Sequence, residues 1–82
     1  MMTFEQFQWS KRHVADVNDA VGMTADEPAS GFVYKDDLHI FDMPEAGKYL
    51  LVIGSAQKVS ADLVALERDL YDYGIREGML AD

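Results

Sequence analysis

The sequence predicts a single α+β domain, with a three-stranded antiparallel meander flanked by an N-terminal and a C-terminal helix in the order αβββα. Apolar residues recur at spacings of three and four near both ends of the chain, which is typical of amphipathic helices. The central part instead holds short runs of β-branched and aromatic residues separated by turn residues, which is typical of strands. A chain of 82 residues is the length of one domain, so we expect residues 1–82 to fold together.

The first helix is expected over residues 4–21. Thr3 suits the N-cap, and Gln6 stands in the capping-box position three residues later. One helical stripe collects the apolar side chains Phe4, Phe7, Val14, Val17 and Val21. Gly22 suits the position just after the helix, and residues 23–30 are expected to form a loop.

Three strands are expected over residues 31–35, 38–43 and 48–53, each rich in aromatic and branched side chains. Asp36–Asp37 predicts a two-residue hairpin loop, and residues 44–47 predict a four-residue loop that begins with proline and ends with glycine. Loops this short join antiparallel neighbours, so the strands form a meander in chain order.

The second helix is expected to follow a short irregular lead-in, with Ser60 as its N-cap. Its apolar stripe consists of Leu63, Leu66, Leu70 and Tyr73. The helix ends either at Gly74 or at Gly78, and we favour continuation to about Glu77. Both helices are expected on one face of the sheet, with Phe7, Val14, Leu66 and Leu70 in the core.

The residues carry no recognisable catalytic or cofactor motif. The chain lacks cysteine, and its glycines stand at the edges of predicted elements rather than in a phosphate-binding loop. Asp37, His39 and Asp42 are the only local set resembling metal ligands, but strand alternation sends His39 and Asp42 to opposite faces. We therefore expect no enzyme activity, no metal and no cofactor.

The net charge of −8, from 15 acidic and seven basic residues, bears most directly on function. Such a field repels nucleic acid and anionic membranes and attracts basic protein surfaces, including those that bind nucleic acid. The longest apolar run, residues 49–53, is far too short to span a bilayer, and the first residues do not resemble a signal peptide. The expected protein is soluble and cytoplasmic, and it binds neither nucleic acid nor membrane.

Two interpretations of the acidity remain open. Acidic side chains commonly do no more than solvate loops and outer helix faces. Alternatively, they imitate the phosphates of a nucleic acid and bind a basic partner. Residues 26–45 carry a net charge of −5, and the carboxylates expected to project from one hairpin end are Asp36, Asp37, Asp42 and Glu45. The next candidates lie on the second helix: Glu67, Asp69 and Asp72.

Trp9 is a further candidate for partner binding. It falls on the side of the first helix opposite the apolar stripe. An aromatic side chain in that position is either a half-buried cover for other elements or an anchor for an interface.

In length, lack of cysteine, αβββα plan and acidity, the chain resembles the small acidic anti-CRISPR proteins that bind type I Cascade surfaces. The resemblance covers the whole chain, and no sequence motif carries it. It implies a non-enzymatic inhibitor that occupies a basic nucleic-acid-binding surface, such as the Cascade backbone subunits of a guide-RNA complex in a bacterial cytoplasm. The alternative is an acidic accessory interaction protein, homodimeric through a strand edge or Trp9, without mimicry of nucleic acid.

Overall fold

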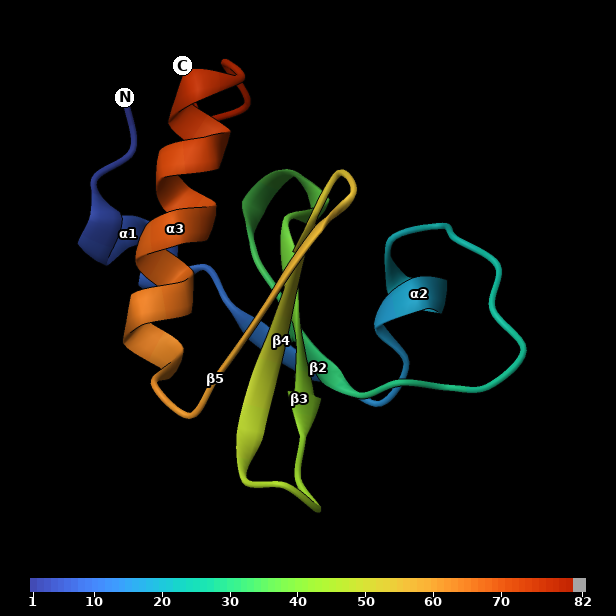
Figure 1. Cartoon of the computed structure of the whole chain (residues 1–82). Helices are drawn as coiled ribbons and strands as arrows, with labels where there is room; N and C mark the ends of the chain where they lie inside the picture. The colour runs from blue at the N-terminus through green and yellow to red at the C-terminus, as the bar shows by residue number, and fades with distance from the viewer. Residues whose placement is uncertain (81–82) are drawn as a thin grey trace.

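The computed structural model describes residues 1–80 and contains a five-stranded antiparallel sheet with helices, so the α+β class is confirmed (Figure 1). The strands lie in chain order: β1 (Arg12–Val14), β2 (Gly31–Val33), β3 (His39–Met43), β4 (Lys48–Ile53) and β5 (Ala56–Ser60). The helices are α1 (Phe4–Trp9), α2 (Val17–Ala20) and α3 (Leu63–Arg76), and a short 3-10 turn, η1, covers Lys35–Asp37. The prediction of only three strands was wrong, because the sheet has one further strand at each edge of the expected meander, β1 and β5.

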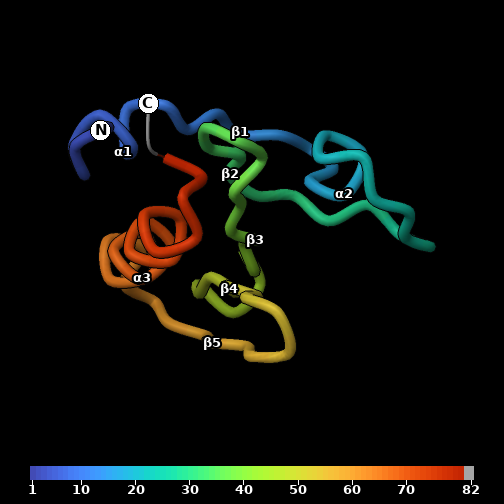
Figure 2. Tube along the Cα trace, turned by 90° about the horizontal axis from the view of Figure 1, so that it is seen from above, coloured from blue at the N-terminus to red at the C-terminus, as the bar shows by residue number. Residues whose placement is uncertain are grey.

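Helices α1 and α3 lie together on one side of the sheet, whereas α2 lies on the other side (Figures 1 and 2). The core fills the space between α1, α3 and the sheet, and it consists of Phe7, Tyr34, Leu38, Ile40, Leu51, Leu66, Leu70 and Leu80. Of the four predicted core residues, Phe7, Leu66 and Leu70 are buried, but Val14 is only partly buried at the end of β1. On the opposite side, the buried Val17 of α2 packs close to Gly31.

The prediction of one helix over residues 4–21 was wrong. The capping box of Thr3 and Gln6 is present, but the helix stops at Ser10. The Ser10 hydroxyl donates to the Phe7 carbonyl at 2.6 Å and accepts the Lys35 amide at 3.2 Å. After Ser10 the chain continues into β1, which pairs with β2 so that Arg12 lies opposite Val33. These tertiary contacts outweigh the helix-like spacing of the apolar residues.

Strand β5 occupies most of the segment that was expected to be an irregular lead-in to the second helix. A two-residue turn at Gly54–Ser55 reverses the chain, with Gly54 at a φ of 61°. All of β5 then pairs with β4, from Ile53 opposite Ala56 to Tyr49 opposite Ser60. Its side chains are mostly exposed, so hydrophobic patterning could not find this strand.

Helix α3 extends to Arg76 with Glu77 as its C-cap, so the preferred continuation through Gly74 is confirmed. Gly74 is buried, and a Cβ atom there would come within 2.8 Å of the Leu80 side chain, which explains a glycine inside the helix. The predicted N-cap was wrong: Asp62 caps the helix by accepting the Ala65 amide, while the Ser60 hydroxyl accepts the Asp62 amide.

Candidate partner-binding surface

The acidic residues expected at one hairpin end are divided between two ends of the sheet. Asp36 and Asp37 lie in the β2–β3 connection, whereas Asp42 and Glu45 lie near the β3–β4 turn, at the other end of β3 (Figure 1). The prediction of one acidic hairpin end was therefore wrong, because successive turns of an antiparallel meander alternate between opposite ends of the sheet. No continuous track joins these four carboxylates.

The Asp36–Asp37 pair is the more exposed of the two groups. The connection is the three-residue turn η1 rather than the predicted two-residue loop, and it is closed by the Tyr34 amide donating to the Leu38 carbonyl at 2.7 Å. Asp36 and Asp37 both adopt left-handed backbone conformations, with φ values of 60° and 61°. Aspartate tolerates this conformation better than most residues, and neither carboxylate has an ion-pair partner among residues 1–80.

Asp42 is committed to contacts within the protein. Its carboxylate accepts hydrogen bonds from the Ser30 hydroxyl and from Nε2 of His13, the latter at 2.9 Å. Burial alone would raise the pKa of Asp42, but these two hydrogen bonds and the nearby His13 outweigh it and lower the pKa below its ordinary value. The order Ser30–Asp42–His13 also differs from a hydrolase triad, in which histidine lies between the serine and the carboxylate. Glu45, in contrast, is exposed in the β3–β4 turn.

Glu67 does not belong to any surface, which corrects its prediction as a partner-binding residue. Its side chain is fully buried, and its carboxylate accepts the Tyr34 hydroxyl at 2.6 Å, Nζ of Lys11 at 2.8 Å and Nε2 of Gln8 at 3.1 Å. Burial, together with the hydrogen bond to Glu67 and its charge, raises the pKa of Tyr34 far above the ordinary tyrosine value. This network joins α1, the end of β2 and α3, and its role is structural.

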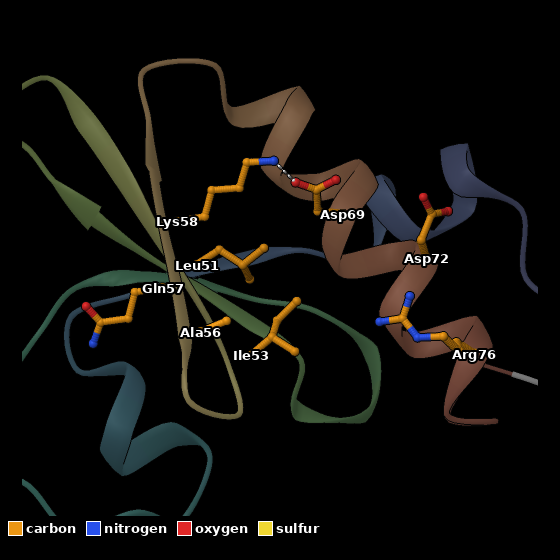
Figure 3. A pocket seen from close by; sticks show the side chains of 8 residues that line it. All are labelled: Leu51, Ile53, Ala56, Gln57, Lys58, Asp69, Asp72 and Arg76. Atoms are coloured by element: carbon orange, nitrogen blue, oxygen red, sulfur yellow. Dashed lines mark hydrogen bonds and ion pairs between the residues drawn. The ribbon is translucent and has the colours of Figure 1, made fainter.

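Asp69 and Asp72 lie on α3 and face a groove of about 410 Å³ between that helix and the β4–β5 hairpin (Figure 3). The floor of the groove consists of Leu51, Ile53 and Ala56. Asp69 forms an ion pair with Lys58 of β5 across the groove, as the dashed line in Figure 3 marks. Asp72 is exposed and has no ion-pair partner among residues 1–80.

Trp9 exposes 72% of its surface at the end of α1, which excludes the alternative that it covers other elements. A large exposed aromatic side chain remains a candidate anchor for an interface. It lies on a different element from each acidic pair, so the predicted site residues do not form one contiguous constellation.

Sequence reasoning missed Lys58 as a groove residue because it missed β5, and without β5 it had no groove in which to place Arg76 of the predicted second helix. The Gly54–Ser55 dipeptide was the available signal, since glycine followed by serine between two extended runs favours a two-residue hairpin.

Residues 1–80 contain no group of three or more His, Asp or Glu side chains arranged to hold a metal ion. No helix in that part of the chain combines the length and apolar character needed to cross a membrane. Comparisons with family models, curated proteins and solved structures found no match to this chain.

Proposed function

We propose that this chain is a non-enzymatic binding protein that occupies a basic surface of another protein through exposed carboxylates. The observation that carries the proposal is the distribution of charge: a net charge of −8, with Glu67 as the only charged side chain buried within residues 1–80. Nearly all of the acidity therefore faces solvent, where it attracts a positively charged partner and accelerates encounter.

The exposed Asp36–Asp37 pair is the strongest local candidate for the contact. Two adjacent carboxylates with no ion-pair partner among residues 1–80 are available to the guanidinium and ammonium groups that otherwise bind phosphates. We propose a guide-RNA complex of the type I Cascade class as the partner, in keeping with the resemblance to acidic anti-CRISPR proteins. Because the acidic residues lie at two ends of the sheet, we restrict the proposed contact to Asp36 and Asp37. Asp42 and Glu67 are excluded because their carboxylates bind groups within the protein.

The test measures binding of the purified chain to purified type I Cascade at graded NaCl concentrations. The variant Asp36→Lys/Asp37→Lys should bind at least about tenfold more weakly, because reversal replaces attraction with repulsion at each facing cation. The matched control, Asp26→Lys/Glu27→Lys, alters the net charge of −8 by the same amount but lies in the exposed loop after α2. Equal weakening of both variants would indicate general charge attraction without a local site, and unchanged binding of the first variant would refute the proposed contact.

A second candidate function, a homodimeric accessory protein, is favoured by one observation, the exposed Trp9. Sedimentation velocity over a range of protein concentrations tests it directly. A dimer that dissociates in Trp9→Ala but persists at high salt would favour this function, because a dimer held by apolar contact is insensitive to screening.

A further inference from the structure

Strand β5 leaves one edge of the sheet without a partner strand. β5 is the last strand of the order β1–β5, and its only neighbour within the sheet is β4. In a two-residue hairpin the closing pair, here Ile53 and Ala56, is hydrogen-bonded, so alternation also directs the backbone of Lys58 toward β4. The N–H and C=O groups of Gln57 and Val59 then face the open edge, and no backbone hydrogen bond from them to another segment occurs within residues 1–80.

The groove between α3 and the β4–β5 hairpin lies directly beside this edge (Figure 3). The Lys58–Asp69 ion pair spans the groove, and the part between that pair and Arg76 has Ile53 and Ala56 on its floor. An extended segment that pairs with β5 would direct alternate side chains toward this apolar floor. Edge pairing with a flanking groove is the arrangement by which strand addition gains affinity from the backbone and specificity from side chains.

We propose that β5 and α3 form a binding site for an extended, basic segment of a partner protein, which adds to the sheet as a sixth strand. An apolar side chain of the segment enters the groove over Ile53. A Lys or Arg two positions along the segment, which strand alternation directs to the same face, contacts Asp72. The basic character of the segment follows from the net charge of −8 and from the exposed Asp72, which lacks an ion-pair partner among residues 1–80. In this respect the inference rests on the proposed function.

A second copy of this chain fits the same edge less well. Two molecules that each carry a charge of −8 repel each other, and strand addition would bring them into direct contact. An acidic segment would meet the same repulsion. The charged lining of the groove is balanced, with Lys58 and Arg76 against Asp69 and Asp72, and Lys58 already neutralises Asp69. The preference for a basic segment therefore comes from the net charge of −8 and from Asp72.

The first experiment selects nine-residue random peptides displayed on phage against the immobilised full chain. We expect enrichment of peptides with an extended pattern in which a Lys or Arg stands two positions from an apolar residue, so that both side chains face the groove. Gln57→Pro should weaken their binding at least about tenfold, because it removes the outward N–H and places a ring at the edge. It removes no hydrogen bond to β4, and the control Gln57→Ala, which keeps the N–H, should bind within about twofold of the parent.

A second pair of variants keeps the inference testable if Gln57→Pro perturbs folding. Asp72→Arg should weaken binding of the same peptides at least about fivefold, whereas Asp26→Arg, an equal change of charge in the distant exposed loop, should have a smaller effect. Circular dichroism confirms that each variant is folded.

Four outcomes would overturn the inference. These are no enrichment over an unrelated acidic protein, enrichment of acidic peptides, equal binding to Gln57→Pro and Gln57→Ala, and a parent dimer that Gln57→Pro dissociates. Failure of the proposed function gives a different result, because the Asp36→Lys/Asp37→Lys variant lies outside the groove and should bind the selected peptides nearly as the parent does. Suppose that the Asp36→Lys/Asp37→Lys variant loses Cascade binding, and that the peptides bind Gln57→Pro as tightly as they bind the parent. Only the groove inference then fails.

Discussion

At the scale of single residues, Glu67 shows how strongly context determines what a carboxylate does. The sequence places it one residue from Leu66 on α3, among acids that otherwise reach solvent. In the fold it is fully buried, with three donors around its carboxylate from Gln8, Lys11 and Tyr34. Three hydrogen bonds satisfy most of the acceptor capacity of a buried carboxylate, so the network is stable although it lies in the interior.

Glu67→Ala should lower the free energy of unfolding by about 3 kcal/mol, because it leaves the buried Tyr34 hydroxyl without its acceptor and Lys11 without its counter-charge. Urea denaturation followed by tryptophan fluorescence measures the change. Glu67→Gln, which keeps an acceptor of similar shape, should cost less than the alanine variant. The control Glu77→Ala at the exposed C-cap of α3 should change stability by under about 0.5 kcal/mol. A Glu67→Ala variant as stable as the control would show that the network contributes nothing.

At the scale of elements, Asp42 links the two ends of the β1–β2 connection, which contains α2. The chain leaves the sheet after β1 and returns at β2, and His13 and Ser30 stand near these two points. Both side chains bind the Asp42 carboxylate, and the Asp42 amide donates to the Ser30 carbonyl at 3.0 Å. One carboxylate on β3 therefore fixes the start and the end of a long connection.

The lowered pKa of Asp42 makes this contact sensitive to acid. A carboxyl whose pKa is lower in the folded state contributes stability above its unfolded pKa and loses that contribution as the pH falls through the folded value. Asp42→Asn should therefore destabilise the chain at pH 7, and the difference from the parent should shrink below the ordinary aspartate pKa of 3.8. Hydrogen exchange of residues 15–30 should also accelerate in this variant.

Urea denaturation at several pH values measures the first effect, and Asp26→Asn in the exposed loop is the control. A stability difference between Asp42→Asn and the parent that stays constant from pH 7 to pH 2.5 would contradict the assignment.

The elements that the sequence predicted correctly are those whose own side chains decide the structure. Strand β4 matches its predicted range, and α3 has the apolar stripe that buries Leu66 and Leu70. Strands β1 and β5 escaped prediction because their stability comes from pairing with neighbours, while their side chains are mostly exposed. In the first predicted helix, Asp16 was the missed signal: its side chain accepts the Asp19 amide and starts a new helix within the expected one.

The candidate site was harder to predict than the fold. The sequence identifies which residues are acidic, but burial of Glu67 and the internal contacts of Asp42 depend on partners far along the chain. Three acidic candidates, Asp36, Asp37 and Glu45, combine a turn position with the exposure that the surface role requires, and only Asp36 and Asp37 lie next to each other.

At the scale of the whole molecule, the net charge of −8 is concentrated in a fold with a radius of gyration of 12.1 Å. The Debye length is about 10 Å at 0.1 M salt and about 3 Å at 1 M, so carboxylates on opposite sides repel one another at low salt and are screened at high salt. Self-repulsion of this kind destabilises the compact state. In the Lys11–Glu67 pair the carboxylate is buried and the lysine is only partly exposed, so salt screens this attraction less than it screens the repulsion among surface carboxylates.

We therefore expect the melting temperature to rise by several degrees between 0.1 M and 1 M NaCl, since about 1 kcal/mol corresponds to about 4–8 °C in a domain of this size.

NaCl also has effects unrelated to charge, and the Asp26→Lys/Glu27→Lys variant controls for them because it carries half of the parent's net charge of −8. Its melting temperature at 0.1 M should exceed that of the parent, and its rise with salt should be smaller. Differential scanning calorimetry on both proteins measures the comparison. An equal rise in the two proteins would assign the effect to salt itself, and a fall in the parent would mean that attractive surface pairs, such as Lys58–Asp69, outweigh repulsion among the carboxylates that we propose for partner binding.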